Sequence, residues 1–181
     1  MKIKVMLLAV LALGLLSAAA VSAAPQDLVL ILDASNSMNK AFGADTRIQA
    51  ARTALAEILG AMPEQGNVGL LVFGHRIGYQ NQVESCQDIE LLFPIAPFNR
   101  TAANQMTAAV NQVIAQGKTP LADALSKAAN ELAARGRGGA IILISDGEGN
   151  CGGQELAVAK MIGTMSPEIC LHIVGLDVEA E

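Results

Sequence analysis

Oxygen-bearing side chains follow a short apolar stretch near the start of the chain. The stretch Leu28–Leu32 contains only Leu, Val and Ile, and Asp33, Ser35 and Ser37 come directly after it. An apolar run of this length is typical of a strand that is buried on both faces of a parallel sheet. Ligands bind at the carboxyl ends of such strands, near the point where the strand order reverses. Three hard oxygen ligands at that place indicate a divalent-cation site, and a simple polar turn is the alternative.

Two later segments offer further oxygen ligands. Thr119 stands just before an amphipathic helical pattern, and Asp146 follows the apolar run Ala140–Ile144. If the strands that end near Asp33 and Asp146 are neighbours, the two carboxylates face each other at one edge of the sheet, with the loop of Thr119 beside them.

The resulting donor set is Asp33, Ser35, Ser37, Thr119 and Asp146. It contains only oxygen, with no His or Cys, which favours Mg²⁺ or Mn²⁺, leaves Ca²⁺ as an alternative and argues against zinc. Since only the two aspartates are charged, the ion would keep an open or water-filled position.

Strand and helix patterns alternate along the chain and must position these residues. After the first strand, helical patterns start at Thr46, Thr101, Pro120 and Gln154, and strand patterns cover Val68–Phe73, Ile89–Phe93, Ala140–Ile144 and Cys170–Asp177. This alternation predicts an α/β fold, a Rossmann-like three-layer sandwich with a mainly parallel central sheet and helices on both faces.

Local signals refine three of these elements. Thr46 and Gln49 have the spacing of a capping box at the start of a helix. Thr101 is the expected cap of the next helix. The strand Ile89–Phe93 is expected at an edge of the sheet, because two prolines follow it.

The N-terminus has the pattern of a secretory signal peptide. Two lysines precede the apolar run Val5–Leu16, and small residues follow up to Ala23. We therefore predict a signal peptide over residues 1–23, a domain over residues 24–181, and export to the periplasm or the medium. An uncleaved membrane anchor is the alternative.

Composition narrows the class of partner. The chain of 181 residues has a formal net charge of −5, and only 3% of its residues are aromatic. An acidic chain without a basic cluster or a platform for base stacking is a poor candidate for binding nucleic acid.

Export would permit disulfides among the cysteines, which are Cys86, Cys151 and Cys170. Cys86 and Cys151 both fall in predicted loops and are free to meet, whereas Cys170 begins a strand that is predicted to be buried. We predict the pair Cys86–Cys151 and a free, buried Cys170, with the other two pairings as alternatives.

Three motifs in order resemble a known family. Asp33-Ala-Ser35-Asn-Ser37, then Thr119-Pro-Leu, then Ser-Asp146-Gly resemble the metal-ion-dependent adhesion site of the von Willebrand factor type A domain. The resemblance implies that the serines and the threonine bind the ion directly or through water, and that the aspartates hold it largely through water. It also implies a protein partner whose acidic side chain completes the coordination.

The resemblance extends from about Gln26 to Asp177. The family usually continues with another strand and a closing helix, so we expect these elements to be missing here. We also expect the last strand to leave one side of the sheet unpaired or thinly covered.

These features predict an exported, metal-dependent protein-binding module that is not an enzyme. A metal-dependent hydrolase or phosphoryl-transfer enzyme is the alternative, and a scaffold with a purely structural ion is a third reading. The sequence lacks the Gly-x-Ser-x-Gly elbow of a serine hydrolase. Gly117-Lys118-Thr119 lacks the preceding glycine of a phosphate-binding loop, because that position is Gln112.

Overall fold

In the part of the chain that the structure describes, the central sheet has five strands in the order β5-β4-β1-β6-β7. The computed structural model describes residues 27–147, 149–165 and 167–177. The strands are β1 (Asp27–Asp33), β4 (Asn67–Phe73), β5 (Ile89–Pro97), β6 (Gly139–Ser145) and β7 (Ile169–Gly175). Only β5 is antiparallel to its neighbour, β4, so the predicted mainly parallel sheet is confirmed.

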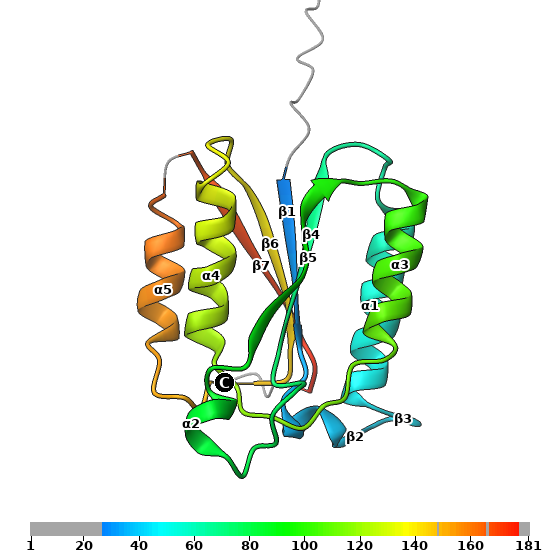
Figure 1. Cartoon of the computed structure of the whole chain (residues 1–181), viewed down its shortest axis with the longest axis vertical. Coiled ribbons are helices and arrows are strands. Elements are labelled where there is room, and N and C mark those ends of the chain that lie inside the picture. The colour runs from blue at the N-terminus through cyan, green and yellow to red at the C-terminus, as the bar shows by residue number, and fades with distance from the viewer. Residues whose placement is uncertain (1–26, 148, 166, 178–181) are drawn as a thin grey trace, which may run out of the picture.

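Helices cover both faces of this sheet (Figure 1). On one face lie α1 (Arg47–Ala61) and α3 (Arg100–Val110), and on the other lie α4 (Leu121–Ala133) and α5 (Glu155–Ile162). The predicted three-layer α/β sandwich is therefore confirmed.

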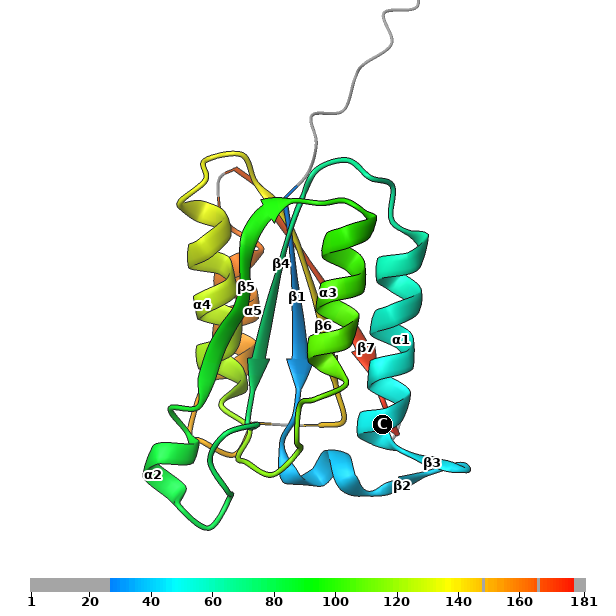
Figure 2. The same cartoon turned by 45° about the vertical axis from the view of Figure 1, so that its right-hand side comes forward.

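Several short elements gather near the carboxyl ends of β1 and β4 (Figure 2). They are the 3₁₀ helix η1 (Asn36–Asn39), a small two-stranded sheet made of β2 (Ala41–Phe42) and β3 (Asp45–Thr46), and the helix α2 (Gln82–Ser85). The sequence patterns had indicated only loops in these places.

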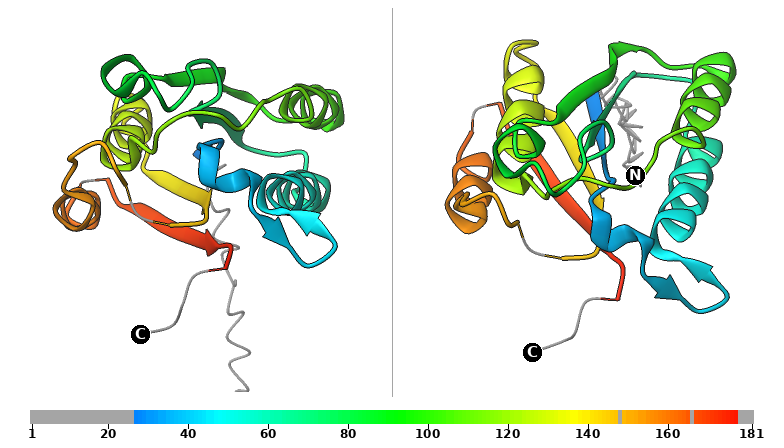
Figure 3. Two further views of the ribbon diagram at one scale, coloured as in Figure 1. Left: turned by 90° about the horizontal axis from the view of Figure 1, so that it is seen from below. Right: turned by 60° about the horizontal axis from the view of Figure 1, so that its bottom comes forward.

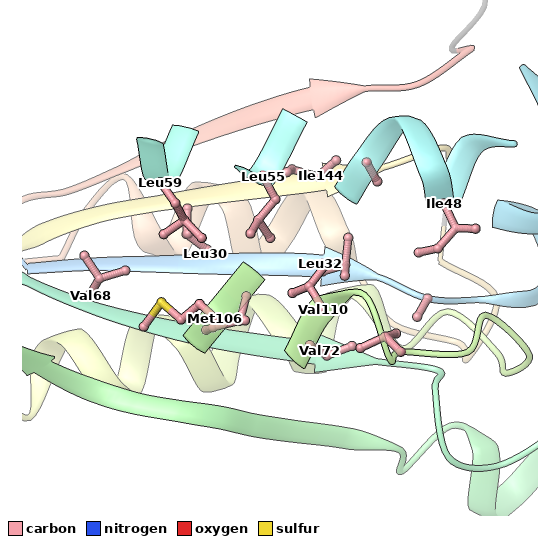
Figure 4. Packing of buried hydrophobic residues seen from close by; sticks show 14 of the residues in the cluster. Leu30, Leu32, Ile48, Leu55, Leu59, Val68, Val72, Met106, Val110 and Ile144 are labelled. Carbon is pink, nitrogen blue, oxygen red and sulfur yellow. The ribbon is translucent and has the colours of Figure 1, made fainter. Parts of the chain in front are cut away.

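Strand β1 forms the centre of the hydrophobic core. Its alternate side chains point to opposite faces, because successive residues of a strand do so. Leu30 and Leu32 belong to the cluster under α1 and α3, together with Leu55 and Met106 (Figure 4), whereas Ile31 belongs to the cluster under α4. Each fully buried leucine contributes about 1.5–3 kcal/mol. This packing fixes the position at which β1 ends, and therefore the position of the site.

The helix caps agree only in part with the sequence prediction. The capping box of α1 is confirmed, since the Thr46 N–H donates to Gln49 Oε1 at 2.8 Å. The predicted cap Thr101 is wrong. The helix α3 begins before that residue, and Asn99 caps it by accepting a hydrogen bond from the Ala102 N–H at 2.9 Å.

The two edge strands also differ from the prediction. The position of β5 at an edge is confirmed, but the strand continues through Pro94 to Pro97 instead of ending at Phe93. An edge strand tolerates proline, because the missing N–H can face away from the ladder.

The opposite edge is β7, which the sequence analysis treated as buried. Most of β7 is instead exposed, because it pairs only with β6 among the described strands. The predicted burial of Cys170 is wrong, since this free cysteine is exposed. The expected thin cover of the last strand is confirmed for the described residues, and Ile173 is 64% exposed.

The predicted signal peptide, residues 1–23, lies outside the described residues. No helix of the described part of the chain is long and apolar enough to cross a bilayer.

Candidate metal centre

The segments that carry the predicted ligands lie at the carboxyl ends of β1 and β6, at the end of the sheet where the short elements gather (Figure 3). β1 and β6 are parallel neighbours, and Leu32 pairs with Ile144. This register brings the ends of both strands together, with Asp33 on one and Asp146 just after the other. The predicted neighbourhood of these two strands is confirmed.

The other three residues come from two loops at the same edge. After β1, the chain turns into η1, which carries Ser37. Ser35 forms an isolated parallel bridge with Gly117, so the loop that carries Thr119 lies alongside. The fold thus places all five residues at one end of the molecule.

Four of the five residues form a continuous hydrogen-bonded chain. The Ser35 N–H donates to Asp33 Oδ1 at 2.7 Å, and the Ser35 and Ser37 hydroxyls lie 3.0 Å apart. Ser37 Oγ donates to Asp146 Oδ1 at 2.8 Å. The second oxygen of Asp33 accepts from Ser145 Oγ at 2.6 Å. Both aspartates are therefore oriented by neighbouring serines.

Thr119 joins the serines through a shared cavity rather than through a hydrogen bond. This cavity has a volume of about 210 Å³, and Ser35, Ser37 and Thr119 line it. The remaining lining residues are Asn36, Lys40, Tyr79, Gly117, Lys118 and Asn150. The two aspartates do not line the cavity. A water molecule needs roughly 10–15 Å³ on this measure, so a hydrated cation has ample room.

The electrostatics of Asp33 fit a cation. Asp33 is wholly buried, and this burial raises the pKa of its carboxyl from 3.8 to about 6. Hydrogen bonds from Ser145 and Ser35 oppose this rise in pKa, and the charge of Asp146 adds to it. A nearby cation would favour the ionised form.

The donor chemistry also fits a hard ion. Within the described ranges, no group of three or more His, Cys, Asp or Glu side chains is arranged so that it could hold a metal ion. A site here therefore depends on hydroxyl oxygens in addition to the two carboxylates, a mixture that suits Mg²⁺ better than a soft metal.

Arg47 is a site residue that the sequence analysis missed. It occupies the first turn of α1, and its Nη1 lies 2.5 Å from Asp146 Oδ2 while its Nη2 pairs with Asp177. The hydrogen bond to Asp177 raises the pKa of Arg47; burial opposes this rise, and the bond to Asp146 reinforces it. A signal was present in the sequence, because Arg47, Ala51 and Leu55 share one helical face. An arginine on a buried face implies a buried carboxylate partner.

The predicted disulfide Cys86–Cys151 is confirmed, with Cα atoms 5.5 Å apart. It connects the end of α2 to the loop after Asp146. In that loop Asn150 was also missed. Its Oδ1 accepts a hydrogen bond from the Thr119 N–H at 2.8 Å.

Comparison with known proteins identifies the family. The profile of the von Willebrand factor type A domain matches residues 28–148, which include all five predicted ligands. The chain belongs to the von Willebrand factor type A family. The matched range begins within β1 and ends just after β6.

Two uncharacterized proteins of Bacillus subtilis (strain 168) are similar in sequence to this von Willebrand factor type A (vWA) domain. YwmC is 29% identical over 159 residues, which cover 85% of this chain and 67% of YwmC. YwmD is 26% identical over 169 residues, which cover 91% of this chain and 74% of YwmD.

Solved structures show the same vWA fold. A von Willebrand factor type A protein from Catenulispora acidiphila aligns with a TM-score of 0.63 at 18% identity, over 84% of this chain and 33% of that chain. The pilus adhesin SpaC from Lactobacillus rhamnosus GG aligns with a TM-score of 0.57 at 23% identity, over 71% of this chain and 16% of SpaC. The chain therefore spans a third or less of these larger proteins.

Proposed function

We propose that this vWA domain is an exported module that binds a protein partner through a divalent cation, with Mg²⁺ as the first candidate and Mn²⁺ or Ca²⁺ as alternatives. The proposed ligands are Asp33, Ser35, Ser37, Thr119 and Asp146. One observation carries the proposal: Ser35, Ser37 and Thr119 line an open cavity, and the two serines are hydrogen-bonded to the two aspartates, Ser35 through its N–H to Asp33 and Ser37 through its hydroxyl to Asp146.

The arrangement suggests different roles for the two kinds of ligand. Ser35, Ser37 and Thr119 face the cavity and would supply neutral oxygens to the ion. Asp33 and Asp146 stand behind the serines and would supply the negative charge, mostly through hydrogen bonds and water. When bound, the cation would offer a positive attachment point for a carboxylate, because the neutral oxygens leave its charge incompletely balanced.

The rim of the cavity favours an acidic partner. Lys40 and Lys118 line the cavity together with Tyr79, which is 44% exposed. Two ammonium groups beside a cation attract acidic surfaces and speed their association. SpaC, which shares the fold, is a pilus adhesin. This similarity supports protein binding as the function of the present domain.

We propose binding rather than catalysis because neither histidine lines the cavity. His75 Nε2 lies 2.9 Å from Glu90 Oε2, and His172 is exposed on β7. The rim therefore provides no imidazole as a general base for a hydrolase.

Capture of partners from the exported fraction tests this function. Immobilised wild-type domain should retain a protein in Mg²⁺ and release it when the ion is chelated, and Asp146→Ala should retain none. Glu57→Ala removes an exposed acid on α1 and serves as the matched control. Retention that is unchanged by chelation or by Asp146→Ala would contradict the proposal.

Export is part of the same proposal and has its own test. We propose that cleavage after Ala23 releases the domain with Ala24 at its N-terminus. The mass of the exported protein measures this directly, and retention of residues 1–23 would favour a membrane anchor.

A further inference from the structure

The peptide segment that carries Thr119 is held from two sides. On one side, the Lys118 N–H donates to Ser85 Oγ at 2.8 Å. On the other, the Thr119 N–H donates to Asn150 Oδ1 at 2.8 Å, and the Asn150 N–H donates to the Thr119 carbonyl at 3.1 Å. Ser85 and Asn150 together therefore fix the backbone position from which the Thr119 hydroxyl reaches the cavity.

The two holding residues are joined covalently. Ser85 immediately precedes Cys86, Asn150 immediately precedes Cys151, and these cysteines form the disulfide. The bond thus closes a ring around the Lys118–Thr119 segment, which we call the Thr119 clamp. It consists of Ser85, Cys86, Asn150 and Cys151.

The two arms of the clamp differ in how firmly the rest of the fold holds them. The helix α2 has only four residues and its Val83 is 68% exposed, but Ser85 is wholly buried and its hydroxyl also donates to the Ile77 carbonyl at 3.0 Å. The other arm contains Gly147, Gly149, Gly152 and Gly153, which give a chain segment high conformational entropy when it is released. The disulfide therefore ties the glycine-rich arm that carries Asn150 to the firmly held arm that carries Ser85.

The remaining ligands have supports of their own outside this clamp. Asp33 ends the buried strand β1, Ser35 and Ser37 follow it, and Asp146 is held by Ser37 and Arg47. Opening of the disulfide would consequently disturb Thr119 and leave the other four residues in position.

We propose that the Cys86–Cys151 disulfide is a thiol-sensitive clamp that positions Thr119, and that its reduction weakens cation and partner binding. This inference rests on the proposed function. Both cysteines are partly exposed, so a dithiol can reach them. The dithiol gives two electrons and two protons to the S–S bond, leaves Cys86 and Cys151 as thiols, and becomes a cyclic disulfide itself.

The test compares the oxidised chain, the chain reduced with dithiothreitol, and the double variant Cys86→Ser/Cys151→Ser. Cys170→Ser is the matched control, because this exposed cysteine is outside the clamp. Hydrogen exchange of the Lys118 and Thr119 amides measures the clamp without any ion, and calorimetric titration with Mn²⁺ measures the site. We expect faster exchange at both amides and roughly 10-fold weaker Mn²⁺ binding without the disulfide, the effect of losing one or two hydrogen bonds. Cys170→Ser should behave like wild type.

Asn150→Ala provides a second test with the disulfide intact. This variant still tests the clamp if the double cysteine variant does not fold. It should speed exchange at Thr119 and weaken Mn²⁺ binding. Unchanged exchange and unchanged Mn²⁺ affinity in the reduced chain would overturn the clamp and leave the proposed function standing. If the oxidised wild type does not bind Mn²⁺, the proposed function is overturned. The proposed role of the clamp in cation binding is then overturned as well.

Discussion

Arg47 Nη1 lies 2.5 Å from Asp146 Oδ2, and this ion pair ties the first turn of α1 to the segment that follows β6. Both side chains are nearly buried, with 11% and 4% of their surfaces exposed. The same guanidinium reaches Asp177, just beyond the end of β7. Arg47 therefore partly neutralises a carboxylate that would otherwise repel Asp33 across the site.

Substitution of Arg47 should destabilise the fold and increase its dependence on the cation. We expect Arg47→Met to lower the stability of the metal-free protein by as much as about 3–5 kcal/mol, because it leaves a buried carboxylate unpaired. The stabilisation by Mg²⁺ should then be larger than in wild type, since the ion takes over the neutralisation of Asp146. Urea unfolding with and without Mg²⁺ measures both effects.

Arg100→Met is the control for this prediction. Arg100 forms an exposed pair with Glu64 at 4.0 Å, and its removal should cost no more than about 1 kcal/mol. Equal losses for the two arginine variants would show that Arg47 has no special role.

Removal of either aspartate should abolish stabilisation by the cation. Wild type should gain roughly 2.7 kcal/mol at an ion concentration 100 times the dissociation constant, because the ion binds only the folded state. Asp33→Ala and Asp146→Ala should show no gain, and Glu57→Ala should behave like wild type. Melting curves with and without Mg²⁺ or Mn²⁺ check this. If Asp146→Ala kept the full cation-induced shift in melting temperature, the metal-site interpretation would fail and these residues would be interpreted as a polar turn.

Thr119→Ala should separate partner binding from ion binding. Thr119 shares the cavity with Ser35 and Ser37 but has no hydrogen bond to them or to the aspartates within the described part of the chain. The variant should therefore keep part of the melting shift caused by Mg²⁺, as an ion affinity about 10-fold weaker would leave it, and lose most of the partner binding. Parallel melting and capture experiments measure the two effects, and equal losses in both would contradict this division of roles.

The stability of the domain should fall in acid partly because of Asp88. Burial opposes ionisation of this side chain, but hydrogen bonds from the Arg76 and Ile77 N–H groups and from the Arg76 guanidinium hold its pKa below the usual value. A lowered folded-state pKa gives stability that is present above the unfolded pKa of about 3.9 and is lost as the pH falls through the folded value.

Denaturant unfolding between about pH 5 and 2 measures this acid loss. Asp88→Asn should be less stable than wild type at neutral pH and should lose less stability on acidification. Some acid loss should remain in the variant, because the pKa of Asp27 is also lowered. Burial opposes that shift as well, and hydrogen bonds from Arg135 and Asn67 outweigh it. A variant with the full acid loss of wild type would contradict the assignment.

The exposed edge at β7 should cause self-association of the isolated domain, residues 24–181. Unpaired strand edges with apolar side chains invite pairing with another chain, and Ile173 is 64% exposed there. Ile173→Lys should reduce association, because a charged side chain on an edge strand blocks such pairing. Sedimentation velocity over a concentration series checks this, and a monomeric wild type would refute it.

The sequence by itself determined the features that depend on short-range patterns. The apolar run of β1, the alternation of strands and helices, and the box formed by Thr46 and Gln49 are all local. Asp33, Ser35, Ser37 and Asp146 were also found from the sequence, because polar residues that follow buried parallel strands gather at one edge of the sheet. Thr119, which precedes a helix, joined the proposed ligands through the order of the three motifs that resemble the vWA family. The disulfide was predicted because only Cys86 and Cys151 fall in loops near that edge.

Only the tertiary structure decided which side chains support the site. Arg47 meets partners 99 and 130 residues away, and Thr119 meets Asn150 at a separation of 31. No local pattern encodes such pairs, since they depend on strand order and on the path of each loop. Cys170 was wrongly predicted to be buried for the same reason. An apolar strand pattern indicates a sheet, but the number of neighbours that cover the strand is a property of the whole fold.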